Sequence, residues 1–266
     1  MDWGLQGKTA VVTGASQGIG LAIARTLAAE GVGIVIVGRT PERLAHAAKV
    51  ARDAVPASIA PQIHPLVADL SLLAEVDRVA EMALARLDHV DILVNSAAAT
   101  RTGPFFEASD EDLVETWQVK ALGYVRMVRA LAPHMTERRE GRIVNIVGGA
   151  ARTPTPDFIV GSMVNAALVN FTRGISRELA QYNVRINAIS PGWTMTERQE
   201  RSFALQAAAR HVSVDELERQ QTRSIPLRRL VASDEIALLT LMLISDRLPS
   251  MTGEDIVIDG GATPSV

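Results

Sequence analysis

The chain has 266 residues, of which 47% are hydrophobic, with a net charge of −3 and no cysteine. A chain of this length and composition buries a large core, so a disordered protein is excluded. The lack of cysteine excludes disulfides, thiolate catalysis and cysteine-based metal sites, and the small negative charge argues against nucleic-acid binding.

The five histidines are scattered without ligand spacing, so we expect no metal. The first residues contain no apolar leader, and no run approaches the roughly eighteen uninterrupted apolar residues that a membrane span requires. We therefore expect a cytoplasmic protein that does not insert into a membrane.

Short β-rich runs alternate with longer helical ones along the chain. Several of the short runs are apolar on both faces, which is typical of strands covered by helices on both sides. The predicted strands are residues 9–13, 33–38, 63–68, 92–95, 142–147, 185–190 and 255–258. The predicted helices are residues 19–30, 41–54, 72–85, 110–132, 157–181 and 233–243.

Seven strands joined by helices predict right-handed crossovers and an α/β Rossmann fold, with one doubly wound, seven-stranded parallel sheet and helices on both faces. No Gly/Ser-rich or Pro-rich linker divides the pattern, so residues 1–266 are predicted to form a single domain.

Residues 192–229 interrupt the alternation, because no strand is predicted there and charged, helix-favouring residues fill the segment. We interpret it as a lid over the carboxyl edge of the sheet, where ligands of such folds bind. Its apolar residues, Phe203, Ala204, Leu205 and 207–209, favour a hydrophobic small-molecule ligand.

Residues 13–20, Thr-Gly-Ala-Ser-Gln-Gly-Ile-Gly, directly follow the first strand and open the first helix. Glycines allow the backbone to turn sharply and approach a pyrophosphate, and the helix N-terminus offers free N–H donors. A tight turn without a ligand is the simpler alternative, but the strand before it and the helix after it both favour a dinucleotide site.

The spacing of Gly14 and Gly18 resembles that of the short-chain dehydrogenase/reductase family. Further matches follow in order: residues 68–70 (Ala-Asp-Leu), 91–95 (Asp-Ile-Leu-Val-Asn), 141–145 (Gly-Arg-Ile-Val-Asn), 184–196 (through Ser-Pro-Gly to Thr194 and Thr196) and 252–261. The resemblance covers essentially the whole chain. It implies cofactor contacts from Gly14, Ser16, Gln17, Gly18, Ile19, Gly20, Arg39, Thr40, Asp69, Leu70, Asn95, Ala97, Asn165, Pro191, Gly192, Thr194 and Thr196.

The end of the second strand indicates which dinucleotide binds. A carboxylate there accepts hydrogen bonds from both adenosine ribose hydroxyls and selects NAD, whereas an arginine binds a 2′-phosphate and selects NADP. This chain has Gly38 at the position that resembles the acidic one, and Arg39 follows it. We therefore predict that NADP(H) is preferred over NAD(H). The alternative is that Arg39 is only a solvent-exposed residue at the end of the strand and binds no phosphate.

The four catalytic residues of the family are all replaced. The resemblance implies a Tyr acid or base, a Lys four residues later, a Ser that binds the substrate oxygen and an Asn on the preceding helix. The corresponding positions are Gly161, Asn165, Gly148 and Gln118. The two tyrosines, Tyr124 and Tyr182, have no Lys four residues later and are expected in mid-helix and at a surface turn.

Without the Tyr hydroxyl, general acid catalysis worth about 10²–10⁴-fold is missing. The candidate substitutes are Arg152, Thr153, Thr155, Asp157, Ser162 and Arg198, each of which also has a simpler structural explanation. Two main readings stay open: an NAD(P)(H)-dependent oxidoreductase with nonstandard catalytic residues, and a non-catalytic NADP(H)-binding module that acts as a sensor or partner-binding protein. A different reaction, such as isomerisation, is a third.

Assembly follows only from the resemblance. Relatives pair through the two long helices, here predicted at residues 110–132 and 157–181, which implies a homodimer or homotetramer.

Overall fold

The computed structural model describes residues 2–56, 59, 61–98 and 102–264. One seven-stranded sheet runs through the molecule in the order β3-β2-β1-β4-β5-β6-β9, and every neighbouring pair is parallel. Its strands are β1 (Thr9–Thr13), β2 (Gly33–Gly38), β3 (Ile63–Val67), β4 (Ile92–Asn95), β5 (Gly141–Ile146), β6 (Val184–Pro191) and β9 (Asp255–Ile258). The predicted single-domain Rossmann fold is confirmed.

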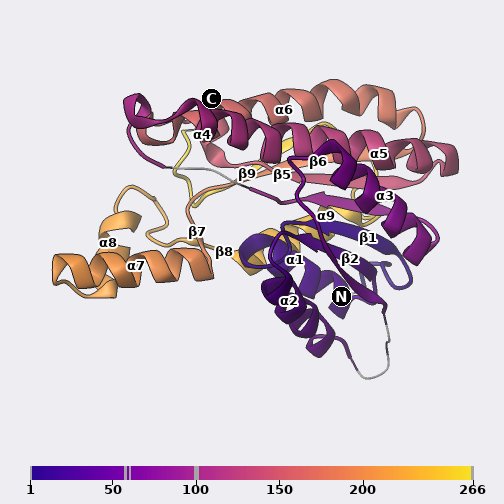
Figure 1. Cartoon of the computed structure of the whole chain (residues 1–266), viewed down its shortest axis with the longest axis horizontal. Coiled ribbons are helices and arrows are strands. Elements are labelled where there is room, and N and C mark those ends of the chain that lie inside the picture. Colours follow the sequence, from indigo (N-terminus) through magenta and orange to yellow (C-terminus); the bar gives the residue numbers. More distant parts are fainter. Residues whose placement is uncertain (1, 57–58, 60, 99–101, 265–266) are drawn as a thin grey trace.

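Helices cover both faces of this sheet (Figure 1). One face carries α1 (Gly18–Ala29), α2 (Pro41–Asp53) and α9 (Ser233–Ile244), and the other carries α3 (Leu73–Leu87), α5 (Gly123–Arg138) and α6 (Ile159–Ala180). The strand order reverses between β1 and β4, and ligands of such sheets bind outside the carboxyl ends of the strands at that point.

The two faces of the sheet form separate apolar cores. Successive side chains of a strand point to opposite faces, so Val12 and Ile36 pack under α1 and α2 while Val11 and Val35 pack under α3 and α5. All four side chains are fully buried. This two-sided burial explains why the strands are recognised in the sequence as unbroken apolar runs.

The predicted helix over residues 110–132 is divided in the structure. It consists of α4 (Asp110–Thr116), a π-helical segment η2 (Trp117–Leu122) and α5. Such π turns are rare and are frequently found at functional sites. Hydrophobic periodicity is too coarse to distinguish the wider turn from an ordinary one, so the sequence predicts a single helix.

Residues 192–229 contain a strand that the sequence did not predict. The two residues of β7 (Thr194–Met195) pair with β8 (Val231–Ala232), and strands this short leave no periodic pattern. Between them, α7 (Glu197–Arg210) and α8 (Val214–Thr222) stand to one side of the sheet (Figure 1).

The helices α7 and α8 have their own small core. Phe203 and Ala207 are buried there with Leu217, Ile225 and Leu230. Two of the apolar residues that favoured a hydrophobic ligand are thus occupied in packing this segment, although Leu205 remains exposed.

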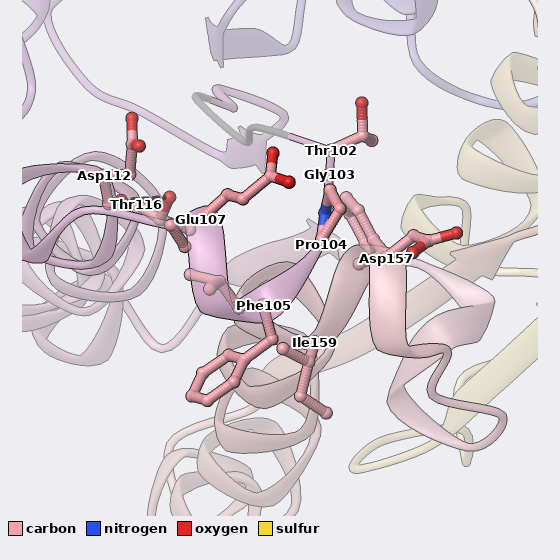
Figure 2. Close-up of a pocket in the computed structure, with 12 residues that line it drawn as sticks. Thr102, Gly103, Pro104, Phe105, Glu107, Asp112, Thr116, Asp157 and Ile159 are labelled. Carbon is pink, nitrogen blue, oxygen red and sulfur yellow. Dashed lines mark hydrogen bonds between the residues drawn. The ribbon is translucent and has the colours of Figure 1, made fainter.

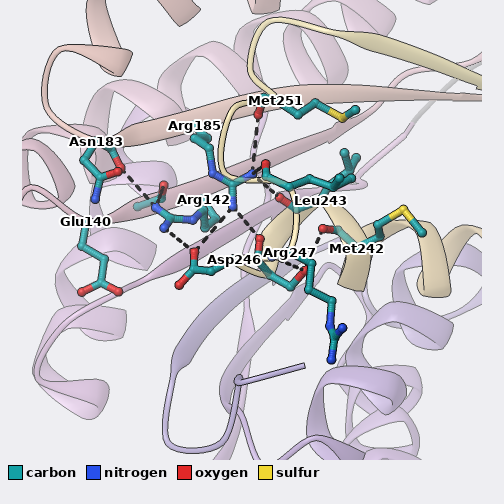
Figure 3. A network of polar contacts seen from close by, with 12 residues as sticks. Glu140, Arg142, Asn183, Arg185, Met242, Leu243, Asp246, Arg247 and Met251 are labelled. Carbon is teal, nitrogen blue, oxygen red and sulfur yellow. Dashed lines mark hydrogen bonds and ion pairs between the residues drawn. The ribbon is translucent and has the colours of Figure 1, made fainter. Parts of the chain in front are cut away.

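An arginine network lies at the amino ends of β5 and β6, where Arg142 and Arg185 are the second residues of their strands. Figure 3 shows its polar contacts. Arg185 donates to the carbonyls of Leu243 (2.8 Å) and Ser245 (2.7 Å), and Arg142 pairs with Asp246 at 2.7 Å. Burial lowers the pKa of Arg185 to about 10. Cations bind favourably to the carbonyls at a helix C-terminus, so this network fixes the end of α9 to β5 and β6.

Within the described residues, one helical stretch, Pro156–Ala180, is long and apolar enough to cross a membrane by length and composition. Core helices pass the same test, and α6 packs on β6 in this fold. The finding is weak evidence for a membrane span.

Candidate functional site

The glycine turn joins β1 to α1 at the carboxyl edge of the sheet. Gly14 and Gly18 have φ angles of 64° and 58°, which favour glycine. A Cβ on Gly14 would lie 2.6 Å from the Ser96 carbonyl oxygen, and one on Gly20 would lie 2.3 Å from the Gly14 carbonyl oxygen. These positions require glycine because the turn packs directly on the end of β4 and on itself.

The first turn of α1 binds an anion within the chain itself. The Gly18 N–H donates to Glu197 Oε2 at 2.9 Å, which places a carboxylate at the positive end of the helix. A Cβ on Gly18 would lie 3.4 Å from Thr196 Cγ2, so the start of α7 packs in van der Waals contact with this turn. Glu197 stands in for a phosphate oxygen, and the turn therefore fits the pyrophosphate of a dinucleotide.

Arginines gather beside the turn. Arg39 follows β2 with a half-exposed side chain, and only a 3.5 Å contact joins its Nη1 to Glu115 Oε1. Gln17 Oε1 lies 3.5 Å from Arg43 Nη1 and 3.4 Å from Arg201 Nη2. The guanidinium groups give this corner the charge and donors that a phosphate monoester requires.

The sequence did not indicate Arg43, Arg201 or Glu197 as site residues. The Gly18–Glu197 contact joins residues 179 positions apart, and sequence spacing says nothing about such a pair. Arg43 lies on the exposed face of α2, where an arginine is ordinary.

The remaining residues predicted to contact a cofactor lie at or just after the carboxyl ends of β2, β3, β4 and β6, at the same edge of the sheet. They are Thr40, Asp69, Leu70, Asn95, Ala97, Pro191, Gly192, Thr194 and Thr196. Asn95 Nδ2 donates to Asn145 Oδ1 at 3.0 Å, so this amide also ties β4 to β5. Asn95 Oδ1 is buried and has no hydrogen-bond partner among the described residues.

The space beside Gly161 on α6 is filled by a phenyl ring. A Cβ on Gly161 would lie 2.3 Å from Cζ of Phe158, one turn earlier in the chain. Phe158 thus occupies the volume into which a side chain at position 161 would project. The sequence did not reveal this, because the ring comes from the 3₁₀ turn η4 (Pro156–Phe158) that precedes α6.

Lys120, and not Gln118, is the side chain of η2 that reaches Asn165. Lys120 Nζ donates to Asn165 Oδ1 at 2.7 Å and to the Val147 carbonyl at 2.5 Å. Both side chains are buried. Burial lowers the pKa of Lys120 to about 7. The sequence suggested Gln118 as the counterpart of the family's Asn, and the residue of this segment that contacts Asn165 lies two positions later.

The candidate substitutes for the catalytic residues mostly have structural partners. Ser162 Oγ donates to the Phe158 carbonyl at 2.9 Å, as a helical serine commonly does. Arg152 Nε pairs with Asp255 at 3.0 Å, and Thr153 Oγ1 lies 3.4 Å from the Gly149 carbonyl. Thr155 precedes η4 without a side-chain cap, and Asp157 faces a pocket. The side chain of Arg198 lies outside the described residues.

The tyrosines lie where the sequence analysis expected them. Tyr124 is buried in α5 and donates to the Ile146 carbonyl at 3.0 Å, and burial raises its pKa. Tyr182 is 42% exposed just beyond α6.

A pocket opens between the segment after β4, the start of α4 and the start of α6 (Figure 2). Phe105, Phe158 and Ile159 form part of its wall, and the carboxylates of Glu107 and Asp157 lie at its edge. Because Phe158 both lines the pocket and covers Gly161, the pocket adjoins the part of α6 that carries Asn165.

Comparisons with known proteins agree with this geometry. The family model described as enoyl-(acyl carrier protein) reductase matches residues 14–263. The chain is 36% identical to the 2,3-dihydro-2,3-dihydroxybenzoate dehydrogenase of Bacillus subtilis, covering 99% of this chain and 98% of that protein. It is 30% identical to the NADPH-dependent reductase BacG of the same organism, over 97% and 99% of the two chains.

Among solved structures, the L-sorbose reductase of Gluconobacter frateurii, complexed with NADPH and L-sorbose, superposes with a TM-score of 0.94 at 29% identity, and 100% of both chains is covered. The relatives are dehydrogenases and reductases that match over their full length. The glycine turn, the strand order and these matches together show that the chain belongs to the short-chain dehydrogenase/reductase family of NAD(P)-dependent oxidoreductases.

Proposed function

We propose that this chain is an NADP(H)-dependent oxidoreductase that transfers hydride between the nicotinamide and a carbonyl or alcohol substrate, with nonstandard catalytic residues. The single observation that carries the proposal is the N-terminus of α1, whose Gly18 N–H already binds a carboxylate beside a cluster of arginines. The bound dinucleotide supplies or accepts the hydride. The names of BacG and of the L-sorbose reductase complex, both of which mention NADPH, support the choice of cofactor.

In this proposal each end of the cofactor has its own set of residues. The turn with Gly14, Ser16, Gln17, Gly18, Ile19 and Gly20 binds the pyrophosphate, Arg39 and Thr40 bind the 2′-phosphate, and Asp69 and Leu70 bind the adenine. Asn95, Ala97, Asn165, Pro191, Gly192, Thr194 and Thr196 hold the nicotinamide half. All of these residues lie in or beside the carboxyl edge of the sheet, which supports their assignment.

The catalytic centre is proposed to be degenerate. Gly161 offers no hydroxyl, and the ring of Phe158 fills the space in which one would lie. Gly148 offers no donor side chain to the substrate oxygen, and Gln118 does not reach Asn165. The proton of the reaction therefore passes through a different group, through water or through the substrate itself.

Residues 192–229 are proposed to act as a lid. Glu197 holds α7 against the glycine turn, and a pyrophosphate would have to displace it from the Gly18 N–H. Opening and closing of the segment would then follow cofactor binding.

A homodimer or homotetramer is also proposed. Leu122 and Met163 are large apolar side chains exposed on η2 and α6, in the helices through which the resemblance implies pairing.

Replacing Arg39 with alanine is expected to weaken NADPH binding roughly 10- to 100-fold, because a charge-assisted hydrogen bond to phosphate is lost. NADH binding should stay within about twofold, since NADH has no 2′-phosphate. Fluorescence titration of both nucleotides measures the change. Arg86→Ala, which removes an arginine near the end of α3, is the matched control. Equal weakening for both nucleotides would contradict the assignment of Arg39.

Turnover with a panel of carbonyl and alcohol compounds tests the reaction itself. The proposal expects NADPH oxidation or NADP⁺ reduction, followed at the absorbance of the reduced nicotinamide, with at least one compound. Tight NADPH binding without turnover of any compound would instead identify a non-catalytic NADP(H)-binding module.

A further inference from the structure

Lys120 is an ammonium-bearing side chain in the interior of the protein. It is 6% exposed, and it comes from the π-helical segment η2, where an extra residue in the turn directs it inward. Lysine is almost never fully buried unless it is paired. Packing alone therefore does not explain why a lysine occupies this buried position on a π-helical turn.

No carboxylate in the described part of the chain neutralises Lys120. Its two hydrogen bonds go to uncharged oxygens, Val147 O at 2.5 Å and Asn165 Oδ1 at 2.7 Å. Taking an ammonium out of water costs free energy that these two neutral acceptors only partly offset. An apolar side chain of similar length would suit the fold at least as well, so stability does not account for the lysine.

The contact with Lys120 fixes the orientation of Asn165. An ammonium only donates hydrogen bonds, so the amide oxygen must face Lys120 and the amide nitrogen must point the other way. That nitrogen faces Gly148, where an added Cβ would lie 2.8 Å from Asn165 Nδ2. Gly148 has a φ of 140° and is partly exposed. Lys120, Asn165 and Gly148 therefore form one unit at the carboxyl end of β5.

Among the described residues, no other charged side chain on the surrounding elements is shown hydrogen-bonded or ion-paired to Lys120 or Asn165. On α4, Glu115 pairs with Arg39, and Asp112 accepts from the Ser109 N–H. On α5, Arg126 donates to the Ser71 carbonyl, and Tyr124 donates to the Ile146 carbonyl at the end of β5. At the start of α6, Asp157 lies exposed at the pocket. Lys120 is the ionisable side chain that contacts Asn165.

We infer that Lys120 is a positioning residue of the dinucleotide site, which holds the amide of Asn165 with its N–H donors toward the space beside Gly148 and places a positive charge behind it. The inference rests on the proposed function, because it assigns Asn165 to the cofactor. The inference adds that the affinity of the site for the dinucleotide depends on the protonation of Lys120, which is remote from the glycine turn.

Exchanging the side chains of Lys120 and Asn165 tests whether their contact is required for dinucleotide binding. Lys120→Asn removes the cation, and Asn165→Lys places two ammonium groups together, so each single variant is expected to bind NADPH roughly 10- to 100-fold more weakly. The double variant Lys120→Asn/Asn165→Lys restores one lysine and one asparagine in contact. It should recover to within about threefold of the unchanged protein, as measured by fluorescence titration at pH 7.

The pH dependence separates positioning from a packing role. Lys120 titrates near pH 7. Affinity of the unchanged protein for the anionic cofactor should fall several-fold from pH 6 to pH 8.5 as the charge is lost. Lys120→Met, which packs a similar length without a charge, should bind weakly at every pH and should lack the fall in affinity that the unchanged protein shows. Lys49→Met, at an exposed lysine of α2, should keep the original profile.

Three results would overturn the inference. If the unchanged protein binds NADPH and Lys120→Met has the same affinity and the same pH profile, Lys120 is not a positioning residue although the proposed function stands. If the unchanged protein binds no NADPH at any pH, the proposed function fails and the inference fails with it. The inference is also overturned if Lys120→Met is folded and binds NADPH normally while the double variant Lys120→Asn/Asn165→Lys does not recover its affinity.

Discussion

Changing Gly161 to tyrosine is expected to lower the free energy of unfolding by about 1–3 kcal/mol. The new Cβ would lie 2.3 Å from Phe158 Cζ, so the ring must leave its place or α6 must shift. Overpacking of this kind forces side chains out of their preferred rotamers. Urea denaturation followed by circular dichroism measures the loss.

The same substitution elsewhere on α6 is the matched control. Gly174 lies on this helix, and a Cβ there would meet nothing within 4 Å. Gly174→Tyr is therefore expected to be neutral or slightly stabilising, because tyrosine has the higher helix propensity. Removing the obstructing ring in Phe158→Ala/Gly161→Tyr should regain most of the lost stability. If Gly161→Tyr is as stable as Gly174→Tyr, Phe158 does not fill that space.

The second large effect is a change in how stability depends on pH. Lys120 has a pKa of about 7 in the folded chain, against about 10.4 for an unfolded lysine. Between these values the unfolded chain binds more protons than the folded chain, so the free energy of unfolding rises with pH. The contribution of Lys120 is about 2–3 kcal/mol between pH 7 and pH 9.

Lys120→Met should lack this rise. The effects of the substitution on packing and hydrogen bonding do not depend on pH, so the change with pH in the difference between the two curves isolates the ionisation of Lys120. Urea denaturation at pH 7, 8 and 9 measures both curves, with Lys49→Met as the control that should follow the unchanged protein. Parallel curves for Lys120→Met and the unchanged protein would show that folding does not lower the pKa of Lys120.

The fold was predictable because the strands are buried on both faces and the helices between them are regular. The glycine turn was predictable because its glycines lie directly between the first strand and the first helix, and Gly14 and Gly18 have the positive φ angles that favour glycine. These are local consequences of sequence, since strand, turn and helix follow one another along the chain.

What the sequence did not reveal depends on contacts between distant segments. Lys120 lies within a helical pattern, and only the π turn and the end of β5 bring it to Asn165. Glu197 reaches Gly18 through the folding of α7 across the sheet edge. Phe158 covers Gly161 because a 3₁₀ turn precedes α6. Each of these contacts requires a backbone geometry that residue spacing does not encode.

The central claim is that the turn at Gly14–Gly20 holds a dinucleotide with a 2′-phosphate. Calorimetric titration of the unchanged protein with NADPH and with NADH, at equal ionic strength and pH 7, tests it most directly. We predict micromolar binding of NADPH and at least tenfold weaker binding of NADH. No detectable binding of either nucleotide, or equal binding of both, would contradict the account.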